Sequence, residues 1–148
     1  MQRNLLTAQF DAATELKDAG SAVTGNGVAT VGGVNRVVNI GPAFMSATLI
    51  VDVDLLDLSS NDEVYDLVLQ GSTAPDFSSD VVNLLTVRVG KASATGESAD
   101  AVAGRYARSF LNSKDGTKPY PYLRMSHKVA GTTPSINYRA FITKSILA

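Results

Sequence analysis

Cysteine and tryptophan are absent from the 148 residues of this chain, and His127 is its only histidine. Without cysteine the chain has no disulfide, no thiolate metal site and no cysteine nucleophile. A metal site built from several imidazoles is excluded as well, because it needs more than one histidine. We therefore expect no cofactor, and we assign no residue a catalytic or metal-binding role.

A strong charge of one sign is also lacking, since the formal net charge is −1. Such a chain has no basic field to attract polyanions, so we expect no nucleic-acid partner and no membrane partner. The uncharged run of residues 37–51 contains Asn39, Gly41 and Pro42 and is shorter than the roughly 20 apolar residues of a membrane span. The first residues lack the apolar stretch of a secretion signal. We expect a soluble protein made in the cytoplasm.

Short segments in which apolar and polar residues alternate dominate the rest of the sequence. The hydrophobic content of 45% is too high for a disordered chain, and the length suits one domain with a single core. A period of two is typical of half-buried β-strands, and it is clearest in residues 47–54, 64–70, 85–89, 122–128 and 136–143. The predicted inward residues are Leu49, Val51, Val53, Tyr65, Leu67, Leu69, Leu85, Val87, Val89, Leu123, Met125, Ile136, Tyr138, Ala140 and Ile142.

Further strands are predicted at residues 28–31, 34–40 and 105–111, a hairpin turn at residues 25–27 and one helical turn at residues 98–104. About eight short strands with little helix indicate an all-β fold, a single-domain antiparallel jelly-roll sandwich. We expect residues 26–148 to form this jelly-roll domain. Residues 1–25 are either an N-terminal arm or a first strand region.

The two halves of the chain carry opposite charge. Residues 1–80 contain 11 acidic and 3 basic residues, whereas residues 81–148 contain 3 acidic and 10 basic residues. Early and late strands are neighbours in a jelly roll, so the favoured interpretation is pairing of opposite charges across strands within one chain. The alternative is an acidic patch on one protomer that contacts a basic patch on the next.

An acidic segment runs from Asp52 to Asp66 and suggests two kinds of chemistry. Its carboxylates are the ligands that calcium prefers, and a pair of them is what glycoside hydrolysis requires. The spacing fits no calcium loop, and alternation places several of them on the outer faces of strands, where we expect them to face Lys or Arg. The segment contains Asp52, Asp54, Asp57, Asp62, Glu63 and Asp66.

A single histidine, His127, is enough in principle for a Ser-His-Asp triad, but the sequence does not favour one. The chain has no Gly-x-Ser-x-Gly sequence of the kind that exposes a nucleophilic serine. Because His127 shares a strand face with Leu123 and Met125, we expect a hydrogen-bonded structural histidine.

Aromatic and arginine side chains near residue 120 are candidates for a protein interface. Alternation that turns Leu123 and Met125 inward turns their neighbours outward, and exposed Tyr and Arg are enriched at interfaces. Phe141 and Ile50 also fall on outer faces, unless a loop or the second sheet covers them. The first choice of contact residues is Tyr120, Tyr122 and Arg124, and the second is the N-terminal set Leu5, Leu6 and Phe10.

Residues 120–141, which begin Tyr-Pro-Tyr-Leu-Arg-Met and end Asn-Tyr-Arg-Ala-Phe, resemble the C-terminal hairpin of capsid cement (decoration) proteins of tailed bacteriophages. Residues 66–72 resemble a strand that precedes a loop in those proteins, a loop that here contains Phe77. The resemblance covers the chain from about Val28 onward and is a pattern of strands and turns.

The resemblance implies a single jelly-roll domain on the outer surface of the capsid, in the virion, after synthesis in the host cytoplasm. It implies a structural protein, not an enzyme, that binds the major capsid protein across subunit boundaries and stabilises the head against the pressure of the genome. It also implies self-association, with a trimer favoured and a dimer possible. No active-site residue is implied.

Two other functions remain open at this point. A carbohydrate-binding jelly roll for virion adhesion would use Tyr120 and Tyr122 as an exposed aromatic platform. A glycoside hydrolase would use two carboxylates of the segment from Asp52 to Asp66, held in an open cleft.

Overall fold

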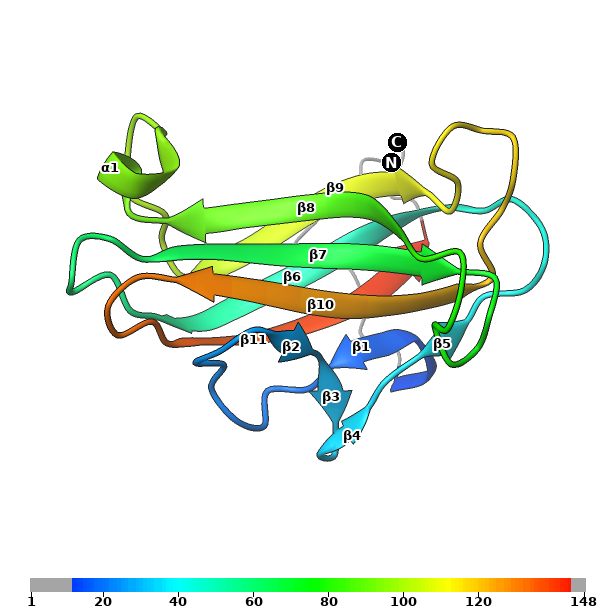
Figure 1. Cartoon of the computed structure of the whole chain (residues 1–148), viewed down its shortest axis with the longest axis horizontal. Coiled ribbons are helices and arrows are strands. Elements are labelled where there is room, and N and C mark those ends of the chain that lie inside the picture. The colour runs from blue at the N-terminus through cyan, green and yellow to red at the C-terminus, as the bar shows by residue number, and fades with distance from the viewer. Residues whose placement is uncertain (1–11, 145–148) are drawn as a thin grey trace, which may run out of the picture.

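The computed structural model describes residues 12–144 and shows two antiparallel β-sheets packed face to face (Figure 1). In strand order, the first sheet contains β1 (Glu15–Lys17), β11 (Ile136–Lys144), β6 (Ser46–Leu56) and β9 (Gly104–Leu111). The second sheet contains β2 (Gly27–Val28), β10 (Tyr122–Ala130), β7 (Val64–Ser72) and β8 (Val82–Gly90), and β5 (Val38–Asn39) also pairs with β10. A small hairpin is formed by β3 (Thr30–Val31) and β4 (Val34–Asn35). The helical turns are η2 (Ala12–Thr14) and α1 (Ala92–Thr95).

The order of the strands identifies the sandwich as a jelly roll. Successive long strands alternate between the sheets, except that β7 and β8 are neighbours in the second sheet. Late strands lie between early ones: β11 separates β1 from β6, and β10 separates β2 from β7. Two interlocked Greek keys produce this arrangement, and the predicted all-β jelly-roll fold is confirmed.

The core fills the space between the two sheets with the alternate residues of the long strands. Leu49 and Val51 of β6 lie beside Ile142 and Ala140 of β11, and they face Leu67 and Leu69 of the second sheet. Burying a side chain of this size contributes roughly 1.5–3 kcal/mol, so the long strands supply most of the stability. Apart from the half-buried Leu85, every residue predicted to face inward is buried in this core.

Several local predictions differ from the structure. The helical turn lies at α1 and not at residues 98–104, because the Asp100 carboxylate accepts a hydrogen bond from Ala92 N at 2.8 Å and draws the following loop back onto α1. Residues 25–27 do not close a hairpin. Val23 pairs with Ile136 of the first sheet while β2 pairs with β10 of the second, so this turn carries the chain from one sheet to the other.

The N-terminal region is part of the sandwich where the structure describes it. β1 pairs with β11 through Glu15 and Phe141, so residues 15–17 form an edge strand of the first sheet. Leu5, Leu6 and Phe10 lie outside the described residues, and their assignment as contact residues stays a prediction. No helix within residues 12–144 is long and apolar enough to cross a membrane.

Candidate binding surface

Tyr122 and Arg124 lie on the outer face of β10, as alternation predicts. The residues between and after them, Leu123 and Met125, are fully buried in the core. Tyr122 and Arg124 are themselves half-buried. The partial burial of Arg124 has a local cause, which is the loop that follows β7.

Residues 73–81 fold back over the outer face of the second sheet and cover Arg124. The guanidinium carbon of Arg124 lies 4.2 Å from the ring centre of Phe77, within the range of a cation–π contact. Arg124 Nε also donates a hydrogen bond to Gln70 Oε1 at 2.9 Å. Phe77 itself is 8% exposed. Arg124 therefore holds the loop to the sheet, which leaves little of its side chain for a partner.

Tyr120 is buried, which corrects the prediction that it faces outward. Its exposed fraction is 9%, and its side chain packs on Gly71, where an added Cβ would lie 2.9 Å from the Tyr120 Cβ. β10 begins at Tyr122, so the alternation of the strand does not extend back across Pro121 to Tyr120. The residue belongs to the interior, and it supplies no exposed aromatic platform.

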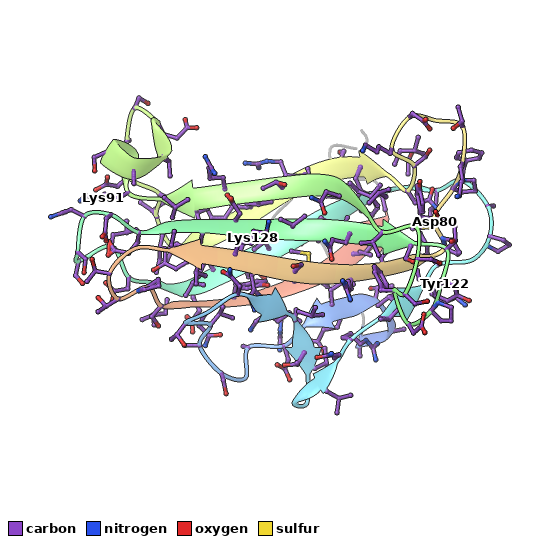
Figure 2. All side chains as sticks on the ribbon, viewed as in Figure 1. Asp80, Lys91, Tyr122 and Lys128 are labelled. Carbon is purple, nitrogen blue, oxygen red and sulfur yellow. The ribbon has the colours of Figure 1, made fainter. Side chains whose placement is uncertain are left out.

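The same end of the sandwich exposes apolar residues that sequence reasoning did not find. Phe44 is 50% exposed, Val81 40% and Leu111 38%. Figure 2 shows Asp80 and Tyr122 at this end and Lys91 at the opposite end. We call Phe44, Val81, Leu111 and Tyr122 the end surface. No periodicity marks Phe44, because it lies in the loop between β5 and β6.

Asn112 brings Phe44 beside Leu111. Its side-chain Oδ1 accepts a hydrogen bond from Met45 N at 2.7 Å, and its Nδ2 donates to the carbonyl of Ala43 at 3.1 Å. The side chain thus bonds to the backbone on both sides of Phe44, directly after Leu111 at the end of β9. Asn112 is fully buried, so both halves of its amide are satisfied inside the protein.

Ile50 and Phe141 lie on the face of the first sheet that is turned away from the core, and they pair with each other across β6 and β11. Their exposed fractions are 0% and 1%, so they are covered. The guanidinium carbon of Arg105 lies 5.8 Å from the ring centre of Phe141. The two residues offer no exposed apolar patch to a partner.

The acidic segment is divided among separate partners. Asp52 pairs with Arg105, and Asp66 pairs with Arg88. Asp62 accepts hydrogen bonds from the backbone and side chain of Thr132, which hold the pKa of Asp62 below its usual value. Residues 12–144 contain no group of three or more Asp, Glu or His side chains placed to hold a metal ion.

The opposite charges of the two halves meet inside one chain. Four ion pairs between described side chains each join an acidic residue before position 81 to a basic residue after it. This result confirms the favoured interpretation of the charge distribution for the three pairs between strands, whereas Asp80 and Lys118 join two loops. The four pairs are Asp66 with Arg88, Asp52 with Arg105, Asp80 with Lys118, and Glu15 with Arg139.

His127 is a buried strand histidine with a hydrogen bond, as predicted. Its Nδ1 lies 3.0 Å from the hydroxyl of Tyr138, and its side chain is almost fully inside the protein. Burial disfavours the charged imidazolium and lowers the pKa of His127 to about 4, and the nearby Lys17 ammonium adds to this effect. The ring is therefore neutral at physiological pH.

Comparisons of this chain with family models, with curated proteins and with solved structures find no match.

Proposed function

We propose that the protein is a capsid cement protein of a tailed bacteriophage, which binds the outer surface of the head across subunits of the major capsid protein. The proposal starts from the resemblance of residues 66–72 and 120–141 to such proteins. These residues form β7 and the segment that contains β10 and β11. β10 and β11 pair with different sheets, so the resembling segment is an arch between the sheets and not a hairpin.

The end surface is the observation that carries the proposal. Aromatic and aliphatic residues with exposed area are what the centre of a protein interface contains. Among the described residues, Val34, Leu55 and Val102 are also exposed, outside the end surface. The outer face of the second sheet presents the polar side chains Ser126, Thr86 and Lys128, as a solvent-facing sheet does. The proposed contact with the capsid is therefore the end surface, which includes Tyr122. Tyr120 and Arg124 are no longer proposed as contact residues.

Binding at a sheet end suits a protein that stabilises a shell mechanically. A ligand that binds only the closed lattice lowers the free energy of that lattice relative to the ruptured shell. If the protein forms the favoured trimer, or a dimer, each assembly carries several end surfaces. Simultaneous contact with neighbouring subunits then converts modest affinity per site into strong retention.

Cosedimentation with empty phage heads tests the proposal. The purified protein is mixed with heads assembled from a major capsid protein, and bound protein is measured in the pelleted fraction. We expect saturable binding, which Phe44→Ser and Tyr122→Ala weaken at least tenfold because each removes exposed apolar area at the end surface. Val34 is 69% exposed at the β3–β4 hairpin, so Val34→Ser is the matched control and should bind as the unchanged protein does.

Unchanged binding by both end-surface variants would reject the end surface as the contact. Absence of any binding to heads, or binding to glycans in its place, would reject the cement function and favour the carbohydrate-binding alternative. Thermal unfolding of each variant is measured in parallel, since Phe44 and Val34 are exposed but Tyr122 is half-buried, and a loss of binding counts only where the fold persists.

A further inference from the structure

A hollow of about 500 Å³ opens where the chain crosses from the first sheet to the second. In Figure 1 this region lies at the edge of the sandwich, where β1, β2 and β3 come together. Lys17 and His127 line the hollow, as do Asp18, Asn26 and the glycine-rich backbone around them. Its volume falls within the range of roughly 300–1,000 Å³ that is usual for small-molecule sites.

Lys17 places a buried positive charge at this hollow. Only 3% of the residue is exposed, and its Nζ donates hydrogen bonds to the carbonyl oxygens of Asp18 at 2.8 Å and Tyr138 at 2.9 Å. No described carboxylate forms an ion pair with it. The ammonium also lies 4.7 Å from the centre of the Tyr138 ring, a cation–π contact, and its two described hydrogen bonds use two of its three N–H donors. Buried charges are normally paired in direct contact, whereas the Asp18 carboxylate acts on this ammonium only through space, beyond ion-pair distance.

His127 directs a second donor to the same hollow. The Tyr138 hydroxyl is buried and has no other acceptor among the described residues, so it donates to His127 Nδ1 across 3.0 Å. In the neutral ring the proton then lies on Nε2, the nitrogen on the opposite side. Nε2 has no hydrogen-bond partner in the described part of the chain, although the residue is only 7% exposed.

The remaining polar groups at the hollow suit hydroxyl groups. Asp18 accepts hydrogen bonds from Gly20 N at 3.1 Å and Gly32 N at 2.7 Å, which fix its carboxylate and leave further acceptor positions. Asn26 Oδ1 accepts from Val129 N at 2.8 Å, so its NH₂ group stays available. A carboxylate acceptor and amide donors are what a polyhydroxylated ligand requires.

We propose that this hollow binds a small hydroxylated carboxylic acid of the sugar-acid class, with its carboxylate on Lys17 and His127 and its hydroxyls on Asp18 and Asn26. A charge-assisted hydrogen bond to a buried ammonium is stronger than a neutral one, so the carboxylate supplies most of the affinity. The site lies apart from the end surface and does not depend on the capsid function.

Titration with glucuronate tests the proposal on the full chain at pH 7. Isothermal calorimetry measures the dissociation constant, and NMR follows the ring carbons of His127, the only histidine. We expect one glucuronate per chain and a shift of the His127 resonances. Glucose lacks the carboxylate and acetate lacks the hydroxyls, so each should bind at least tenfold more weakly. Equal affinity for glucose, or no binding of glucuronate, would overturn the assignment.

Variants locate the site. Lys17→Met keeps the length of the side chain but removes its charge, and it should raise the dissociation constant at least tenfold. Lys128 is exposed on the outer face of β10, so Lys128→Met is the matched control and should leave binding unchanged.

Because Lys17 is buried, Lys17→Met could lose binding simply by unfolding. A second variant at an exposed residue is therefore needed. Thr24 is exposed at the rim of the hollow, and Thr24→Trp should block entry without disturbing the buried groups. Glucuronate binding that persists in Thr24→Trp with unchanged affinity would show that the ligand lies elsewhere and would reject the site, whatever the behaviour of Lys17→Met.

Discussion

Arg105 binds both carboxylate oxygens of Asp52, through Nε at 2.7 Å and Nη2 at 2.9 Å. The two residues face each other across β6 and β9, on the outer side of the first sheet. Parallel hydrogen bonds from one guanidinium to one carboxylate are the strongest geometry for such a pair. The pair joins the acidic half of the chain to the basic half, so the charge asymmetry serves pairing between strands.

A double-mutant cycle on Asp52→Ala and Arg105→Ala measures this pairing. We expect a coupling energy of about 1 kcal/mol in urea unfolding, because the pair is bidentate and partly shielded from solvent. The exposed pair Asp80 and Lys118, with about half of each side chain in solvent, is the control. Its coupling should be at most a few tenths of a kcal/mol. Equal coupling energies in the two pairs would contradict the prediction that shielding from solvent strengthens the pair of Asp52 and Arg105.

The neutral state of His127 predicts a pH dependence of stability. Its pKa is lowered from 6.5 to about 4 in the folded protein, mainly by burial. Between these values the unfolded chain binds a proton that the folded chain excludes, so stability is full above pH 6.5 and falls as the pH drops toward 4. The expected loss is on the order of 3 kcal/mol.

Urea unfolding at several pH values checks this prediction. His127→Gln removes the only histidine and should flatten the dependence over this range, even if it changes the stability itself. An equally steep slope in the variant would assign the effect to other groups.

Gly90 should tolerate no side chain. Its φ is 158°, and an added Cβ would lie 2.5 Å from the carbonyl oxygen of Glu63, which is part of the backbone and has little freedom to move. We expect Gly90→Ala to destabilise the fold by roughly 2–4 kcal/mol, as other overpacked or strained buried sites do. Gly25 has open space around its Cβ position, so Gly25→Ala is the control and should change the unfolding midpoint little.

The core and the fold class follow from local pattern, which is why the sequence predicts them well. Alternation along β6 assigns Leu49, Val51 and Val53 to the interior, and each strand needs only its own residues for that assignment. Strand order needs more than local pattern, but a chain of about eight short strands has few ways to close two sheets.

The contacts near Tyr122 could not be predicted in the same way. The burial of Tyr120 depends on Gly71, and the cover over Arg124 depends on Phe77, both distant in sequence. Alternation also says nothing about a residue before the strand begins. Phe44 and Leu111 become neighbours only because strand β9 pairs with β6 and Asn112 bonds to the loop around Phe44.

The amide of Asn112 should control the shape of the end surface. Besides its bonds on both sides of Phe44, Nδ2 donates to the carbonyl of Tyr120 at 3.2 Å. Asn112→Asp keeps the acceptor for Met45 N but replaces the donor by a second oxygen facing two carbonyls. We expect a loss of roughly 2–3 kcal/mol in stability, because buried acceptors lose their donor and a carboxylate is buried.

The matched control for Asn112→Asp is Asn35→Asp. Asn35 is exposed in β4, which pairs with β3 and not with β10. This control should retain its stability and its binding to phage heads. Asn112→Asp, tested at a temperature where it remains folded, should bind heads less well than the control, because Phe44 is no longer held beside Leu111. Equal binding by the two variants would show that the position of Phe44 does not matter to the contact.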